Sequence, residues 1–240
     1  MPRIDGRGPD QLRSIKITPG FQPYAEGSVL IEQGNTRVAV SVSMEERVPQ
    51  FLKNTGTGWV TAEYAMLPRA TSTRTQRESV QGKLSGRGQE IQRLVGRSLR
   101  AVTDLSALGE RSFVVDCDVL HADAGTRTAA ITGGYIALFI AFEKLRRLGV
   151  IKQMPLRTQV AAVSVAVNRG NILLDPCFEE DCSAESDFNL VMNGNGEFIE
   201  VQGTAEKKAF SKTVLDGVLD LAEAGIRRLF EIQLEAVKSL

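Results

Sequence analysis

The apolar segment between Thr126 and Leu148 constrains the fold more than any other part of the chain. Its middle carries apolar side chains on nearly all sides of a helix, and Gly149 follows where such a helix would end. A helix of this kind is stable in water only when other elements cover it. The sequence therefore predicts a buried helix with strands or further helices packed around it.

Strands and two amphipathic helices are predicted on both sides of this segment. Apolar and polar residues alternate in most of the predicted strands, which span residues 27–33, 37–44, 58–67, 113–120, 160–167, 172–174, 188–192 and 198–201. Gly34-Asn35 and Asn193-Gly194-Asn195-Gly196 are typical hairpin turns. Helical periodicity begins at Gly86 and returns from Lys212 to Leu240. No linker or repeat divides the chain, so we expect a single α/β domain over residues 1–240, with mixed β-sheets and helices packed on them.

The composition excludes several classes of protein and of site. Of 240 residues, 42% are hydrophobic and 24% are charged, as in ordinary soluble proteins. No apolar run approaches the roughly 18–20 residues of a membrane helix. The polar N-terminus lacks a signal-peptide core, so we expect a cytoplasmic protein without a membrane partner. The three cysteines form no CxxC pair and are expected to be reduced, and the single histidine, His121, argues against a Cys/His zinc cluster and imidazole catalysis.

Basic residues are concentrated between Pro68 and Arg100. The chain has 29 basic and 29 acidic residues, but this segment holds eight basic and two acidic ones, a net charge of +6. Seven of the eight are arginine, whose planar guanidinium grips phosphate through two hydrogen bonds. The bias indicates a polyanionic ligand, or else a solvated helix face. Residues 71–85 have almost no apolar side chain, so we expect an exposed loop that is either functional or disordered.

The turn at Gly125 joins a predicted strand to the start of the buried helix. Helix N-termini present unpaired N–H groups and a partial positive charge, and glycine lets a ligand approach the backbone closely. The hydroxyls of Thr126 and Thr128 and the cation of Arg127 complete a set of donors suited to one phosphate. The turn lacks the Gly-Lys-Ser/Thr of a Walker loop. The alternative is an ordinary capped helix start with a solvated arginine.

A second glycine-arginine turn, Gly86-Arg87-Gly88, opens the preceding helix, which suggests that both turns converge on one anion. Two acidic residues, Asp181 and Asp187, stand six positions apart on either side of a short polar connection. Paired carboxylates near a phosphate site usually hold magnesium or manganese. The alternative is an exposed acidic loop. Residues 200–206 form a further polar cluster, or only a turn.

These motifs resemble the ribonuclease PH family of phosphate-dependent exoribonucleases along almost the whole chain. The matching stretches are, in order, Asp5-Gly6-Arg7, Gln11-Leu12-Arg13, residues 58–64, 66–71, 90–94 and 125–130, then Asp187, Asn189, Val191 and Met192, and residues 200–206. A chance match is not expected for so many motifs in this order.

The resemblance implies a ribonuclease PH-type α/β fold and 3′-to-5′ phosphorolysis of RNA, including the 3′ end of precursor tRNA. The reverse reaction would add nucleotides to RNA. The implied phosphate ligands are Arg87, Gly125, Thr126 and Arg127, the implied active-site and metal-binding pair is Asp181 and Asp187, and the implied RNA-binding residues are Arg69, Arg74 and Arg77. The expected co-substrate is inorganic phosphate and the expected metal is magnesium or manganese. The expected assembly is a homo-hexamer built as a trimer of dimers, with RNA and not DNA as its partner.

Two positions depart from the family pattern. Gly88 stands where threonine is frequent, and Ala124 stands where a second glycine is frequent, so helix capping and backbone freedom are expected to change. Neither departure removes a ligand side chain. A catalytically silent RNA-binding subunit of an exosome-like ring is one alternative, but it would tend to lose the acidic pair or the phosphate arginines. A small-molecule kinase is another, but the P-loop lysine is absent.

Overall fold

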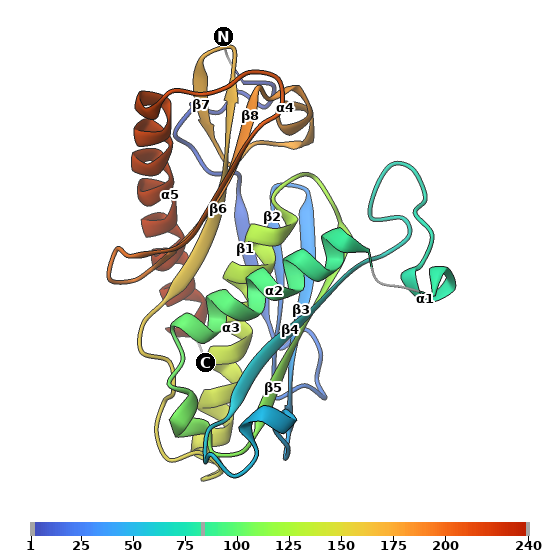
Figure 1. The fold of residues 1–240 in the computed structure, drawn as a ribbon, viewed down its shortest axis with the longest axis vertical. Helices are drawn as coiled ribbons and strands as arrows, with labels where there is room; N and C mark the ends of the chain where they lie inside the picture. The colour runs from blue at the N-terminus through green and yellow to red at the C-terminus, as the bar shows by residue number, and fades with distance from the viewer. Residues whose placement is uncertain (1–2, 83–84, 239–240) are drawn as a thin grey trace.

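Two β-sheets and three long helices make up the protein in a computed structural model that describes residues 3–82 and 85–238 (Figure 1). The first sheet has the order β1 (Ile15–Pro19), β2 (Gly27–Gln33), β3 (Thr36–Glu45), β5 (Ser112–His121) and β4 (Trp59–Met66). The second has the order β7 (Asn171–Leu174), β6 (Val160–Asn168), β8 (Ser186–Asn193) and β9 (Phe198–Ala205). Only β4 and β5 pair in parallel, so the first sheet is mixed and the second is antiparallel over the described residues.

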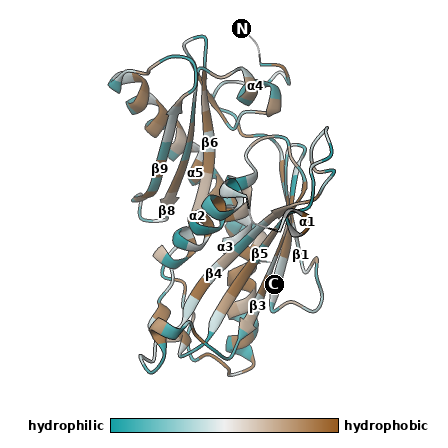
Figure 2. Ribbon diagram, turned by 45° about the vertical axis from the view of Figure 1, so that its right-hand side comes forward, coloured by the Kyte–Doolittle hydropathy of each residue, from teal (hydrophilic) through white to brown (hydrophobic). Residues whose placement is uncertain are grey.

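The long helices begin where the sequence predicts them. They are α2 (Gly86–Ala101), α3 (Thr126–Arg147) and α5 (Lys212–Lys238), and the predicted last two residues of α5 lie outside the described part of the chain. Figure 2 shows both hydropathy colours around α2 and α5, as expected for helices with one buried face. The predicted strands are confirmed, with most of them longer by one to four residues in the structure.

Five short elements were not predicted. They are β1, α1 (Glu78–Gln81), α4 (Phe178–Ser183) and the 3₁₀ turns η1 (Gln50–Leu52) and η2 (Leu105–Leu108). Elements of three to six residues are too short to display a full hydrophobic period, which is the signal that sequence analysis relies on. The expectation of three helices was therefore wrong, and α4 matters for the site described below.

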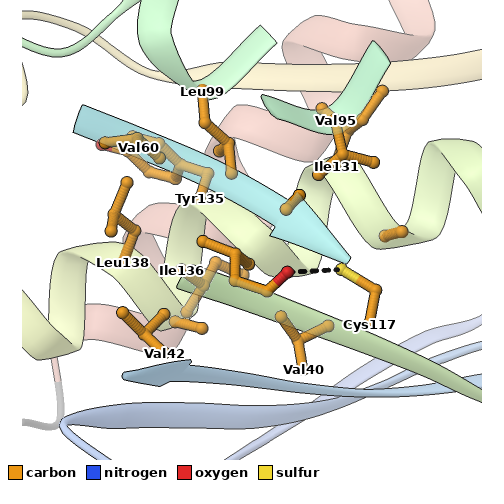
Figure 3. Packing of buried hydrophobic residues seen from close by; sticks show 14 of the residues in the cluster. Val40, Val42, Val60, Val95, Leu99, Cys117, Ile131, Tyr135, Ile136 and Leu138 are labelled. Carbon is orange, nitrogen blue, oxygen red and sulfur yellow. Dashed lines mark hydrogen bonds between the residues drawn. The ribbon is translucent and has the colours of Figure 1, made fainter. Parts of the chain in front are cut away.

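Helix α3 is the centre of the packing. Its glycines let it approach the first sheet closely: a Cβ on Gly133 would lie 2.9 Å from Ile31 Cγ2. Its other side contacts the second sheet, where the Ala162 amide donates to Thr132 Oγ1 over 3.2 Å. Figure 3 shows how side chains of β3, β4, β5, α2 and α3 interlock in this core; those labelled include Val40, Val60, Leu99, Cys117 and Ile131.

By length and composition α3 could cross a membrane, contrary to the expectation that no apolar run approaches that length. Within the described structure, however, 78% of its most apolar window is buried inside the protein. Its hydropathy is that of a core helix covered from several sides, as predicted from the same residues.

Residues 68–82 leave the body of the protein after β4 and carry α1 (Figure 1). The predicted exposed loop over 71–85 is thus interrupted by one helical turn, and residues 83 and 84 lie outside the described part. The start of the segment is fixed, because the Ala122 amide donates to the carbonyl of Ala70 over 2.9 Å. This hydrogen bond holds the base of the segment beside the turn that leads to α3.

Candidate active site

The turn between β5 and α3 is built from two left-handed residues. Ala124 has φ = 55° and Gly125 has φ = 63°, and α3 begins at the next residue. The carbonyl of Ala124 accepts a 2.6 Å hydrogen bond from Thr36 Oγ1, which holds this unusual conformation. The lack of glycine at position 124 is therefore compensated by a side-chain contact. The first N–H groups of α3 have no partner within the helix and are free to bind an anion.

Glycine is required at position 125 for space as well as for backbone angle. A Cβ there would lie 3.0 Å from Arg13 Nη2 and 3.3 Å from Thr128 Oγ1. The positive φ adds strain for any other residue. The turn thus packs directly onto a buried guanidinium, which adds positive charge beneath it.

Arg127 is held in place by residues from two other elements. Its Nη1 donates to Gln202 Oε1 over 2.7 Å and to Glu90 Oε1 over 3.2 Å, and Gln202 Nε2 donates to the same Glu90 oxygen over 2.8 Å. The Arg127 side chain is 17% exposed. Its Nε and Nη2 atoms make no hydrogen bond with any residue that the structure describes, so that edge of the guanidinium is available to a ligand.

Thr126 and Arg87 lie around the same point. The hydroxyl of Tyr64 donates to Thr126 Oγ1 over 2.8 Å. Burial raises the pKa of Tyr64, while the hydrogen bond with Thr126 and the charges of Arg87 and Arg127 oppose that rise. Arg87 is exposed on the first turn of α2, where Ser85 Oγ accepts from the Gly88 amide over 2.9 Å. The helix is therefore capped normally despite the glycine at position 88.

The two aspartates come from different elements. Asp181 lies on α4 and Asp187 lies on β8, so the two stand on either side of a short connection, as predicted, although α4 itself was not predicted. The N-cap of α4 is Cys177, whose backbone amide donates a hydrogen bond to Glu180 Oε2 over 3.1 Å. Such a cysteine cap is not among the usual sequence signals for a helix start.

The charges of the two aspartates and of the nearby arginines influence one another. Burial is the largest cause that raises the pKa of Asp181, although solvent reaches its side chain, and the charge of Asp187 raises it further. Arg87, Arg127 and Arg13 act in the opposite direction. Burial, followed by Glu206, also raises the pKa of Asp187, and Arg127 opposes this. The structure thus brings together side chains that are far apart in the sequence, 94 positions from Arg87 to Asp181 and 60 from Arg127 to Asp187.

The aspartate pair fits a hard divalent cation. Asp187 Oδ1 is buried without a hydrogen-bond partner among the described residues. No group of three or more acidic, histidine or cysteine side chains placed for a metal occurs in residues 3–82 and 85–238. Magnesium does not need such a group, because it commonly binds one or two carboxylates and completes its shell with water and substrate phosphates.

Arg69, Arg74 and Arg77 are not part of this cluster. All three are exposed, and Arg69 Nη1 donates to Ser72 O within its own segment over 2.9 Å. None of the three contributes to the pKa shifts of Tyr64, Asp181 or Asp187. These arginines are therefore exposed on a segment whose base lies beside the turn that leads to α3.

Several residues that build the site were not found from the sequence. Tyr64, Glu90 and Gln202 lie within the family motifs but had no assigned role, and Arg13 had none either. Asp175 gave no signal at all, because a lone aspartate after a strand is usually a turn residue. Their roles depend on contacts across 37 to 162 positions, from that of Glu90 with Arg127 to that of Arg13 with Asp175.

Solved structures identify the fold class of this arrangement. A chain of an Archaeoglobus fulgidus exosome with RNA bound to its active site has a TM-score of 0.83, covers 96% of this chain and 92% of its own length, and is 24% identical. Rice (Oryza sativa) Rrp46 has a TM-score of 0.77 at 21% identity, covering 96% of this chain and 98% of its own. Identities this low establish the fold alone, which is the predicted ribonuclease PH-type fold.

The sequence relatives identify the family. The 3′ exoribonuclease family matches residues 11–142 with its domain 1 and residues 158–225 with its domain 2. Ribonuclease PH of Dehalococcoides mccartyi strain CBDB1 is 70% identical over 97% of both chains, and that of Syntrophomonas wolfei subsp. wolfei is 56% identical over 97% of this chain and 98% of its own. The chain belongs to the 3′ exoribonuclease family. Its two matched parts correspond to the two sheets, so the fold class is confirmed while the single-domain boundary stays a prediction.

Proposed function

We propose that this protein shortens RNA from the 3′ end by phosphorolysis, releasing nucleoside diphosphates, with precursor tRNA among its substrates. The observation that carries the proposal is the convergence of the Gly125 turn and two arginines on a pair of carboxylates, in a chain 70% identical to a ribonuclease PH. Four cationic or N–H donors beside two acids suit a reaction between two phosphate groups. They suit a neutral substrate poorly.

The nucleophile is inorganic phosphate, which binds at the start of α3. The backbone of Gly125 and Thr126 and the free edge of Arg127 receive its oxygens, and Arg87 approaches from α2. Phosphate is already an anion at neutral pH, so no histidine base is needed. His121 lies exposed with Nδ1 2.5 Å from the carbonyl of Asn35, so it contacts the turn between β2 and β3 instead.

The reaction forms one bond to phosphorus and breaks another. A phosphate oxygen attacks the phosphorus of the last phosphodiester, and the bond from that phosphorus to the 3′ oxygen of the preceding nucleotide breaks. The 3′ oxygen takes up a proton and becomes the new RNA end, while the terminal nucleotide leaves as a diphosphate. Arg87 and Arg127 neutralise and orient the two anions, which is the main difficulty of the reaction. We assign assistance of this proton transfer to Asp187.

Asp181 and Asp187 would hold a divalent magnesium or manganese ion. When bound, such an ion supplies Lewis-acid stabilisation of charge on the phosphoryl oxygens. The carboxylates themselves keep the site charged and keep RNA oxygens away until that charge is balanced. The buried and unpartnered Asp187 Oδ1 supports this assignment.

Arg69, Arg74 and Arg77 would hold the RNA backbone beyond the scissile bond. Their exposure supports contacts that grip without reading sequence. We also propose that the chain works in the cytoplasm as a homo-hexamer, a trimer of dimers, and acts on RNA and not DNA. The mass of the particle in solution tests the assembly.

Incubation with RNA in the presence and absence of phosphate tests the function. Nucleoside diphosphates should appear only with phosphate, and excess diphosphate without phosphate should extend the RNA, because the reaction conserves the bond energy. Release of monophosphates in phosphate-free buffer would identify a hydrolase. RNA binding without release would identify a silent exosome-like subunit, and a requirement for ATP would identify a kinase.

A further inference from the structure

A buried network of charges joins the Gly125 turn to the element that carries Asp181. Its centre is Arg13, whose side chain is 4% exposed. Arg13 Nη2 donates to Asp175 Oδ1 over 2.6 Å, its backbone amide donates to Asp175 Oδ2 over 2.8 Å, and its Nη1 donates to the carbonyl of Asp123. Burial would lower the pKa of Arg13, but the charges of Asp175 and Asp123 hold that pKa above its usual value. The cation is thus fixed by acceptors on two sides.

Asp123 is bonded from both directions. Its carbonyl accepts from Arg13, while its Oδ1 accepts from the amide of Phe178 over 2.8 Å. Phe178 is the first residue of α4, and Asp181 follows three positions later. One side chain therefore ties the residue two positions before Gly125 to the N-terminus of the helix that presents Asp181.

Asp175 contributes the strained part of this network. It is fully buried with φ = 51°, and its amide donates to Ser164 O over 2.8 Å. A non-glycine residue in this conformation persists only where its surroundings determine it, and here the Arg13 hydrogen bonds do so. Asp175 and α4 belong to the second family domain, whereas Asp123 and Gly125 belong to the first. The network spans the junction between the two.

We propose that Arg13 and Asp123 are positioning residues that set the distance between the phosphate-binding turn and the Asp181–Asp187 pair. The inference rests on the proposed function, because it assumes phosphate at the turn and a metal at the pair. Helix α4 has six residues and cannot be stable alone. The Arg3–Glu180 ion pair at 2.6 Å holds one side of it, and the Asp123 hydrogen bond holds its N-terminus.

The two residues divide the task. Asp123 acts through its side chain on α4, and so on Asp181. Arg13 acts on the Gly125 turn. Its guanidinium donates to the Asp123 carbonyl and lies next to Gly125, where a Cβ would lie 3.0 Å from Arg13 Nη2. Displacements of about 1 Å in such a frame cost on the order of 100-fold in rate. The two substitutions should therefore weaken different ligands.

Binding measurements on the whole protein test the division. Asp123→Ala removes the acceptor for the Phe178 amide and should weaken Mn²⁺ binding, followed by electron paramagnetic resonance, by roughly tenfold. Asp123→Asn keeps an oxygen acceptor and should restore most of that affinity. Arg13→Lys keeps the charge beside Asp175 but cannot reach Asp123 O at the same time, so it should weaken phosphate binding, followed by calorimetry, by roughly tenfold. RNA affinity should change in none of the three variants.

Gln233→Ala controls for loss of stability. Gln233 lies on α5, far from the acidic pair in sequence, and is fully buried. Its Nε2 donates to Thr132 O over 3.2 Å and to Val160 O over 2.9 Å. It should lower the melting temperature with unchanged Mn²⁺ and phosphate binding. Equal loss of both ligands in the Gln233 variant, or unchanged binding in both Asp123→Ala and Arg13→Lys, would overturn the inference. If Arg127→Lys also leaves phosphate binding unchanged, the proposed function fails instead.

Discussion

Two groups of arginines in this protein differ in how firmly the fold holds them. Arg127 and Arg13 are largely buried, and carboxylate, amide or carbonyl oxygens fix their guanidinium groups. Arg69, Arg74 and Arg77 are exposed in a polar segment that projects from the body (Figure 1). A fixed guanidinium loses little entropy when it binds a small anion, whereas exposed side chains can adapt to a long and variable one. The difference predicts that Arg127 binds phosphate, beside a turn that Arg13 holds in place, and that the exposed group binds RNA backbone.

The acidic pair facing the fixed arginines should show the largest effect. Asp181→Asn and Asp187→Asn each remove one charged oxygen from the proposed metal site and should lower turnover by about 100-fold or more, comparable with the loss of one key electrostatic group. The mass of the assembly should not change. Steady-state rates with and without a chelator measure this. Normal turnover, or a parent enzyme that is indifferent to chelator, would reduce the pair to a structural role.

Substitution within the fixed group comes next. Arg127→Lys keeps the charge but loses the planar fork, so kcat/KM for phosphate should fall by roughly 10- to 100-fold with RNA binding nearly unchanged. Arg97→Lys is the matched control, because Arg97 lies exposed on α2 and pairs with Glu200 at 3.0 Å. That control should behave like the parent. A wild-type dependence on phosphate in Arg127→Lys would show that Arg127 is not a ligand.

The exposed group should respond to RNA length and salt. Replacing Arg69, Arg74 and Arg77 by alanine should weaken binding of long structured RNA and flatten the log–log salt dependence by roughly 0.7 per lost contact with single-stranded RNA. Trimming of a very short oligonucleotide should suffer less, since it barely extends past the aspartates. Both substrates should be measured across a salt series. Equal losses on both, with an unchanged slope, would assign these arginines to the fold or to a subunit interface.

The smallest effect concerns stability. Burial and Glu206 raise the pKa of Asp187, so the folded protein holds its proton more tightly than the unfolded chain. The free energy of unfolding therefore falls as the pH rises from the ordinary aspartate value through the folded one. Asp187→Asn removes that penalty and should raise the melting temperature at neutral pH. The gain should vanish below about pH 4. A lower melting temperature at neutral pH would contradict the assigned cause.

The sequence predicted the long elements because each shows its period over many residues. Helix α3 and the hairpin at Asn193–Gly196 are examples. It did not predict α4, since a six-residue helix capped by cysteine lacks the usual start signals. The periodic signal concerns burial within one element and says nothing about which elements meet.

The same limit applies to the site. Chemistry and family motif were enough to choose Arg87, Thr126, Arg127 and the two aspartates. In the structure the charges of these arginines act on Tyr64 or on the aspartates. The network of Arg13, Asp123 and Asp175 could not be chosen in this way, because its members acquire their roles only when the β5–α3 turn and the β7–α4 connection fold together. Buried ion pairs of this kind leave no periodic trace in a sequence.

Transfer of label from inorganic phosphate to the released nucleotide shows directly whether phosphate is the nucleophile. RNA of defined 3′ end is incubated with radiolabelled phosphate, and the products are separated by charge. We expect nucleoside diphosphates that carry the label in their terminal phosphate. Arg127→Lys should lower the rate at which they form, and the triple alanine variant should preserve that rate on short RNA. Unlabelled monophosphates, or labelled products formed equally well by Arg127→Lys, would contradict it.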